Sequence, residues 1–217
     1  MRITHVGHAC LLVETSGARV LVDPGTFTHG FEELTGLDAV LVTHAHPDHY
    51  DAERMPQLLE ANDGARLIAE PEVSVELKRA GLDAVALHPG ESTSVGDLAV
   101  SAVGGLHATI HEDVPRIGNV GLLLAEEGGP TLFHPGDSYE STPAGVDVLA
   151  VPLSAPWAAI RETVTFLRAV APRAAFPIHD ATLSPVGRGL YLRVLGSLGP
   201  EGTQLSDLAE AGATSFD

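Results

Sequence analysis

The sequence predicts an α/β protein in which two β-sheets pack face to face between outer helices, a four-layer αββα sandwich. Three observations predict it. Short runs rich in Val, Leu and Ile recur along the chain, separated by Gly, Pro and Ser, which is typical of strands. Each half of the chain contains several such runs and only one or two helical patterns. No linker or change of composition separates the halves, so we expect one domain over residues 1–217.

The first half of the chain predicts five strands and one regular helix. The strands are expected at 2–6, 9–14, 18–23, 38–42 and 65–69. A helix is expected over 71–80, because Pro71 suits the first position of a helix. Prolines bracket the segment 48–55, so any helix there is short or broken.

The second half repeats this scheme. Its strands are expected at 97–103, 119–125, 130–134, 146–151 and 174–178. A helix is expected over 156–171, because apolar residues recur three or four positions apart at Trp157, Ile160, Val164, Leu167 and Val170. This spacing predicts that Trp157 packs in the core rather than against a substrate. A last helix is expected within 184–198, and the acidic segment from Gly199 predicts no element.

The charge balance limits the kinds of partner. The net charge is −17, with 12 basic and 29 acidic residues. General binding to nucleic acid or to an anionic membrane needs a cationic surface, so we expect neither. A small-molecule substrate is expected, and self-association stays open. No segment has the length and apolarity of a membrane span or of a secretion signal, which predicts a cytoplasmic protein. Cys10, the only cysteine, lies in an apolar run and is expected to be buried.

Three histidines and an aspartate fall within six residues, directly after the strand expected at 38–42. His44 and His46 are two positions apart, so in extended backbone they project to the same side and can bind one ion. A proline then turns the chain, which lets Asp48 and His49 reach a second ion. Imidazole and carboxylate are ligands of zinc, manganese and iron. Clustered histidines can also be solvated loop residues, but their position after a buried strand favours a metal site.

Further candidate ligands follow later strands. His107 comes after the strand at 97–103 and two glycines, Asp137 comes shortly after Phe133, and His179 ends the strand at 174–178. Side chains at strand ends on one edge of a sandwich can converge on one point. We therefore expect these three residues to lie beside the histidine cluster.

Together with Asp23 in Val22-Asp23-Pro24-Gly25, these residues resemble the ligand pattern of the metallo-β-lactamase superfamily. The resemblance implies the metallo-β-lactamase fold and two divalent metal ions, with zinc favoured over manganese or iron. It implies that one ion is bound by His44, His46 and His107. It implies that the other is bound by Asp48, His49 and His179. Asp137 would bridge the two ions, and Asp23 would orient a ligand.

A finer resemblance is carried by Val6-Gly7-His8-Ala9-Cys10 and by the stretch from Gly105-Leu106-His107 to Asn119-Val120-Gly121. These segments are similar to the branch that contains ascorbate-6-phosphate lactonase and N-acyl-phosphatidylethanolamine phospholipase D. That branch includes many small bacterial hydrolases. True β-lactamases have cysteine or serine at the position of Asp137, and flavodiiron proteins have an acidic residue at that of His46.

The resemblance predicts a hydrolase that cleaves a small lactone, ester or phosphodiester. Two dications about 3.5–4 Å apart would share a water and lower its pKa, so that a bridging hydroxide attacks the substrate. Catalytic roles would fall to Asp48, Asp137 and His179, with Asp48 carrying a proton to the leaving group. The alternatives are a phosphodiesterase or nuclease acting on nucleotides, and a non-catalytic metal-binding scaffold. The intact ligand set argues against the scaffold.

The remaining histidines and a few polar residues are weaker candidates. His8, in a glycine-flanked turn, and His111, four positions after a ligand, are candidates for contact with a ligand or substrate, with exposed loop residues as the alternative. Asn119 and Tyr139 are candidate substrate contacts. His134 fits either a structural or a functional role. The other histidines are expected to be structural, namely His5, His29 and His88.

Overall fold

The computed structural model describes residues 1–217 and contains two seven-stranded sheets. The first, called sheet 1 here, has the strand order β14-β1-β2-β3-β4-β5-β6. Its strands are β1 (Arg2–Gly7), β2 (Cys10–Glu14), β3 (Arg19–Val22), β4 (Ala39–Val42), β5 (Arg66–Ala69), β6 (Ala84–Ala86) and β14 (Thr214–Ser215). Strands β1 to β3 pair antiparallel, whereas β3 to β6 run parallel. The carboxyl ends of the parallel strands therefore share one edge.

The second sheet, sheet 2, has the order β13-β12-β11-β10-β9-β8-β7. Its strands are β7 (Ser92–Val95), β8 (Leu98–Leu106), β9 (Gly118–Glu126), β10 (Thr131–His134), β11 (Val148–Pro152), β12 (Ala174–Ile178) and β13 (Gln204–Leu205). Strands β7 to β10 pair antiparallel, and β10 to β13 run parallel. Sheet 2 thus repeats the plan of sheet 1, as the two similar halves of the sequence predict.

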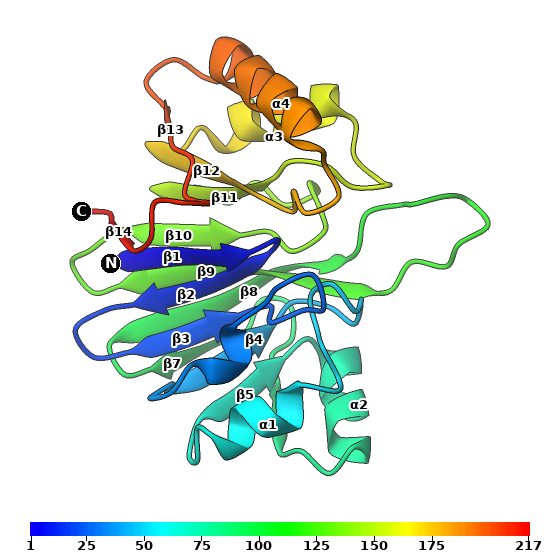
Figure 1. Ribbon diagram of the computed structural model, residues 1–217, viewed down its shortest axis with the longest axis vertical. Coiled ribbons are helices and arrows are strands. Elements are labelled where there is room, and N and C mark those ends of the chain that lie inside the picture. Colours follow the sequence, from blue (N-terminus) through cyan, green and yellow to red (C-terminus); the bar gives the residue numbers. More distant parts are fainter.

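Helices cover the outer face of each sheet (Figure 1). Leu58 of α1 (Met55–Glu60) and Leu77 of α2 (Pro71–Arg79) pack with residues of sheet 1, and the short helix η1 (Phe31–Glu33) joins the same cluster. Val164 and Leu167 of α3 (Ile160–Val170) and Leu195 of α4 (Pro185–Leu198) pack with residues of sheet 2. The order of layers is the predicted αββα sandwich. None of these helices combines the length and the apolarity needed to span a bilayer.

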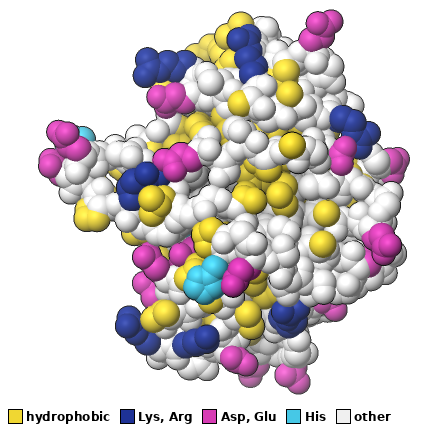
Figure 2. All heavy atoms as spheres, turned by 180° about the vertical axis from the view of Figure 1, so that it is seen from behind, with side chains coloured by type: hydrophobic (Ala, Val, Ile, Leu, Met, Phe, Trp, Pro, Cys, Tyr) yellow, Lys and Arg dark blue, Asp and Glu magenta, His cyan; other side chains and the backbone are white.

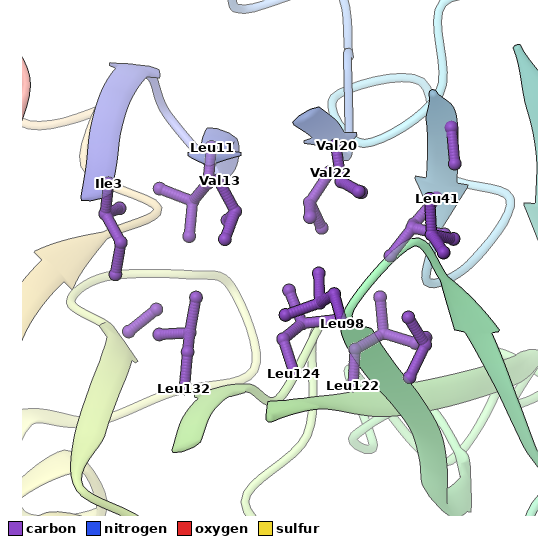
Figure 3. Close-up of a cluster of buried hydrophobic side chains, with 14 of the residues drawn as sticks. Ile3, Leu11, Val13, Val20, Val22, Leu41, Leu98, Leu122, Leu124 and Leu132 are labelled. Carbon is purple, nitrogen blue, oxygen red and sulfur yellow. The ribbon is translucent and has the colours of Figure 1, made fainter. Parts of the chain in front are cut away.

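The main core lies between the two sheets. Figure 3 shows side chains of sheet 1, such as Leu11 and Val22, pointing toward Leu122, Leu124 and Leu132 of sheet 2. Successive residues of β2 alternate, so that Leu11 and Val13 face sheet 2 while Cys10 and Leu12 pack under the outer helices. Strands buried on both faces appear in the sequence as continuous apolar runs. Cys10 is fully buried, as predicted.

One predicted boundary is wrong and affects the site. The helix expected over 156–171 begins only at Ile160, because the backbone N–H of Ala159 donates to the Glu162 carboxylate and caps the helix there. The preceding residues form a tight turn closed by a bridge between Ala155 and Ala158. Trp157 lies in this turn and is half-buried, so it is not a core residue of the helix.

The segment after Gly199, for which no element is predicted, adds one strand to each sheet. Gln204 pairs with Ala174 in sheet 2, and Ser215 pairs with Arg2 in sheet 1. The two ends of the chain consequently lie side by side (Figure 1). The amino-terminal ammonium of Met1 donates to the carbonyl oxygen of Phe216 at 3.2 Å.

The inter-sheet core gives a stability prediction. Leu11→Ala removes a fully buried side chain from this core and should lower the free energy of unfolding by about 2–5 kcal/mol, measured by urea denaturation. Val186 on α4 is 82% exposed and provides the control, for which Val186→Ala should change stability by less than about 0.5 kcal/mol. Similar losses in both variants would contradict an inter-sheet core at Leu11.

Candidate metal centre

The residues predicted as metal ligands meet at one edge of the sandwich. The loop after β4 supplies four of them, at His44, His46, Asp48 and His49. The other three follow β8, β10 and β12 of sheet 2, at His107, Asp137 and His179. Rigid strands from both sheets therefore fix the positions of these side chains.

Their donor atoms form two groups, within each of which all atoms lie within 4.8 Å of one another. One group consists of His44, His46, His107 and Asp137. The other consists of His8, Asp48, His49 and His179. The histidines and Asp48 divide as the resemblance implies, while His8 joins the second group and Asp137 falls in the first.

The Asp137 carboxylate lies between the two groups. Its Oδ2 is 3.3 Å from Nε2 of His107 and 3.2 Å from Nε2 of His179. Its Oδ1 is 3.1 Å from Nε2 of His49. Nε2 of His44 is 3.9 Å from Oδ2. Asp137 can therefore reach an ion held by either group.

Hydrogen bonds on the far side of the rings fix which nitrogen faces the centre. Nδ1 of His107 donates to the carbonyl oxygen of Ala108 at 2.7 Å, and Nδ1 of His179 donates to that of Ser154 at 2.7 Å. A carbonyl oxygen only accepts, so both Nδ1 atoms carry hydrogen. In the neutral ring Nε2 then carries no hydrogen, and its lone pair is directed at the centre. Metal-bound histidine has the same arrangement.

Asp23 orients the other two buried histidines of the predicted ligand set, His44 and His49. Its fully buried carboxylate accepts hydrogen bonds from Nδ1 of His49 at 2.7 Å, from the Thr43 amide at 2.8 Å and from the Thr43 hydroxyl at 2.7 Å. Since the single hydroxyl hydrogen of Thr43 goes to Asp23, its oxygen accepts from Nδ1 of His44 at 3.0 Å. His44 and His49 therefore also present Nε2 to the centre.

Five buried polar atoms at this point have no hydrogen-bond partner. They are Oδ1 of Asp137 and Nε2 of His44, His49, His107 and His179. A buried polar atom without a partner costs about 1–3 kcal/mol and is rare in native proteins, so five at one place call for a ligand. An all-imidazole and carboxylate donor set fits a divalent ion such as zinc, manganese or iron. The residues present therefore fit the metal that the resemblance implies.

Protons and metal ions compete for the same histidine nitrogens at this site. Burial lowers the pKa of His44 well below its usual value. Burial opposes charge on His179 too, but the carboxylates of Asp137 and Asp48, 3.2 and 3.4 Å from its Nε2, outweigh it and raise the pKa of His179 to about 9. Asp137 and Asp23 likewise raise the pKa of His49 well above its usual value, against the effect of burial. In the metal-free protein a proton therefore occupies part of the site at neutral pH.

Glycines allow the ligand loops to pack closely. A Cβ at Gly25 would overlap the Asp48 carbonyl, so the turn after Asp23 can lie against the histidine loop only with glycine there. Gly136 has φ of 59°, and a Cβ would overlap the Asn119 side chain. This close packing explains why glycine occurs in the sequences Asp23-Pro24-Gly25 and Pro135-Gly136-Asp137, next to site residues.

Asn119, a predicted substrate contact, instead holds the Asp137 turn. Its Oδ1 accepts from the Asp137 amide at 2.9 Å, and its Nδ2 donates to the carbonyl of Pro135 at 3.1 Å. The side chain is 1% exposed and both of its polar groups are used inside the fold. It is therefore a positioning residue, which corrects the prediction.

The two histidines singled out beside the ligands differ in position. His8 is buried, and its Nδ1 accepts from the Ala181 amide at 3.3 Å, so the hydrogen on Nε2 points to Oδ2 of Asp48 at 3.1 Å. His111 is exposed in the loop after β8 and accepts from the Asp113 amide at 3.2 Å. The structure thus brings His8 into the site and leaves His111 an exposed loop residue.

Two further histidines are structural. His134 is buried, and its Nε2 lies 2.9 Å from the carbonyl oxygen of Ala9. His5 makes a similar contact to the carbonyl oxygen of His8 at 2.9 Å. Both side chains bond backbone groups of the β1–β2 turn, which fixes the position of His8.

Trp157 is the residue at the site that the sequence interpretation missed. Its indole Nε1 donates to Oδ2 of Asp137 at 2.9 Å. Its ring meets those of His107 and His179 edge to face, with centroids 6.1 and 6.3 Å apart. The signal that could have found it is Glu162, which marks a capped helix start three positions earlier, at Ala159, and so leaves Trp157 outside the helix.

The indole contact predicts an effect on metal affinity. Trp157→Phe keeps an aromatic ring but removes the N–H that holds Asp137, and should weaken metal binding about tenfold, measured by competition with a chromophoric chelator. Tyr139→Phe is the control, since it removes a hydroxyl that bonds Pro152 and Thr163 but no ligand. Unchanged affinity in Trp157→Phe, or an equal loss in both variants, would show that the indole N–H does not position Asp137.

The raised pKa of His179 predicts that metal binding releases protons. At pH 7 this ring is protonated in the metal-free protein, because its pKa is about 9, and an ion that takes Nε2 must displace that proton. Titration calorimetry in buffers of different ionisation enthalpy should show proton release at pH 7 that declines as the pH rises past about 9. Binding enthalpies that are independent of the buffer at pH 7 would contradict this assignment.

Comparison with known proteins identifies the family. Residues 2–179 match the family model described as beta-lactamase superfamily domain. Protein Rv0786c of Mycobacterium tuberculosis is 48% identical over 192 residues, which cover 88% of this chain and 89% of that protein. A UPF0173 metal-dependent hydrolase of Carboxydothermus hydrogenoformans is 31% identical over 202 residues, covering 84% and 85%. Igni18, a metallo hydrolase from Ignicoccus hospitalis, has the same fold, with a TM-score of 0.75 at 18% identity and coverage of 100% and 99%. The chain belongs to the metallo-β-lactamase superfamily.

Proposed function

We propose that this protein is a hydrolase that holds two divalent metal ions at the strand-end site and cleaves a small lactone, ester or phosphodiester. The observation that supports this most directly is the common orientation of four buried histidines. Each of them is anchored through Nδ1 and presents Nε2 to the Asp137 carboxylate. The names of relatives such as the UPF0173 metal-dependent hydrolase agree with this activity.

The two groups of donor atoms indicate which residues would hold each ion. We assign His44, His46 and His107 to one ion. We assign Asp48, His49 and His179 to the other, with Asp137 shared. Divalent ions at such a site supply a nucleophilic water near neutral pH and polarise the scissile oxygen. Two dications outweigh the two carboxylates, so the site is positive within a protein of net charge −17. A carbonyl or phosphate oxygen is thus attracted, while polyanions are repelled by the surface.

Asp48 is the residue that we assign to proton transfer. Its side chain is 20% exposed, against 4% for Asp137, so it is the site carboxylate with access to a leaving group. The Nε2 hydrogen of His8 bonds Oδ2 of Asp48 and fixes the direction of that carboxylate. The His8 turn also belongs to the segment that resembles the ascorbate-6-phosphate lactonase and phospholipase D branch. This supports a small lactone or a small phosphodiester, rather than a nucleic-acid polymer, as substrate.

The proposal predicts joint loss of metal and turnover. Asp137→Asn and His46→Ala should each lower metal content, measured by plasma mass spectrometry. Each should also lower kcat/KM by more than about 100-fold, which is a larger loss than residues that only support the ligands usually cause. The assay uses a panel of lactones, aryl esters and bis(p-nitrophenyl) phosphate. His111→Ala, in the exposed loop, is the control and should retain both properties.

Two outcomes would count against the proposal. Full activity in a variant that has lost its metal would refute metal dependence. A wild-type protein that binds no metal and hydrolyses no member of the panel would favour the scaffold alternative.

A further inference from the structure

A groove of about 510 Å³ lies beside the candidate metal centre, along helix α3. Glu162, Thr165, Phe166 and Ala169 line it from one face of this helix, since they are spaced three or four positions apart. Tyr139 and Trp157 are among the residues that line it from outside the helix. This volume is within the range of small-molecule sites in proteins.

The groove borders residues that contact the candidate ligands. Trp157 lines the groove and donates its indole N–H to Asp137 at 2.9 Å. Ala108 also lines it, and its amide donates to the Asp137 carbonyl while its own carbonyl accepts from Nδ1 of His107. The two residues therefore form a wall shared by the groove and the metal centre. The groove and the metal centre are therefore adjacent, on the two sides of Trp157 and Ala108.

The lining of the groove suits an uncharged apolar group. Half of its ten residues are hydrophobic, and no lysine or arginine lines it. Its only charged side chains, Glu140 and Glu162, already have partners, the Arg116 guanidinium at 2.6 Å and the Ala159 amide at 2.9 Å. An anion placed there would meet two carboxylates, and the nearby Arg116 guanidinium is already paired with one of them. Figure 2 shows apolar side chains exposed between the upper end of the molecule and the base of the projecting loop that connects β8 and β9.

We propose that this groove binds an uncharged, apolar acyl or aryl part of the substrate, and that the scissile bond lies at the metal centre. The identity of the bond rests on the proposed hydrolase function, whereas the groove's preference for apolar ligands does not. For an ester, hydrolysis adds one water across the acyl C–O bond. The water oxygen joins the acyl carbon, and a proton goes to the departing alcohol.

The first test is a series of p-nitrophenyl esters with acyl chains of increasing length. Burial of each added methylene in the groove should raise kcat/KM by about fourfold until the groove is filled. An ester of the same length that ends in a carboxylate should lose at least about tenfold, because an anion in the groove lies near Glu140 and Glu162. A flat series, or a carboxylate ester that reacts as fast as its neutral counterpart, would overturn the proposal.

The second test measures binding without turnover. Trp157 is the only tryptophan, so its fluorescence can report the binding of a neutral, unreactive probe, N-butylhexanamide. Thr165→Glu places a charge on the groove wall and should raise the Kd of this probe by at least about fivefold. Arg168→Glu is the matched control on the same helix, since Arg168 is exposed, lies outside the groove and bonds only the Leu198 carbonyl, and it should change the Kd by less than about twofold. It carries the larger change in charge, so a general electrostatic effect would be greater in the control.

The two tests separate the groove from the reaction. Probe binding that is lost in Thr165→Glu, in a protein that hydrolyses no lactone, ester or phosphodiester of the panel, would support the groove and refute the proposed function. Hydrolysis without any dependence on chain length, together with equal probe binding in both variants, would support the function and overturn the groove.

Discussion

The attraction between the buried carboxylate of Asp137 and the imidazoles around it joins the two sheets at the functional edge. His44 and His49 come from sheet 1, whereas Asp137 itself, His107 and His179 come from sheet 2. A carboxylate with only 4% of its side chain exposed is tolerated because positive or hydrogen-bonding groups surround it. Divalent ions would supply that compensation more fully than protons do. The same arrangement of side chains can therefore both join the two sheets and hold metal ions.

Much of this arrangement is predictable from the sequence, because central strands such as β3, β4 and β12 are buried on both faces and are followed directly by Asp23, Thr43 and His179. The continuous apolar runs predict the strands, and the spacing of His44 and His46 predicts that these two side chains lie together. Strands β6, β13 and β14 are not predictable in this way because they have only two or three residues, and β7 is not because it is mostly polar. Ser92–Val95, for instance, is a strand because it pairs with β8, and pairing between distant segments leaves no local pattern.

The side chains that the sequence misplaces are those whose direction depends on a turn. Trp157 fits the apolar stripe of the helix that follows, yet the cap at Ala159 starts that helix later and leaves the indole free to face Asp137. Asn119 sits at the start of a long strand, and only the fold of the distant Pro135–Asp137 turn gives its amide two partners. The direction of such side chains follows from tertiary contacts, which composition and spacing do not encode.

Backbone strain at the site depends on the stability of the core behind it. Three of the four non-glycine residues with positive φ lie here, His8, Asp23 and His179, at 48–57°. Such conformations cost about 1–3 kcal/mol each and persist only where the surroundings impose them. The strand before each of these residues is held by the inter-sheet core, through Ile3, Val22 and Ile178. Because the ligands span both sheets, an ion at 100 times its Kd would add about 2.7 kcal/mol to folding, comparable to the strain at one or two of these residues. The core therefore maintains the site before an ion binds, and the bound ion would in turn stabilise the packing of the sheets.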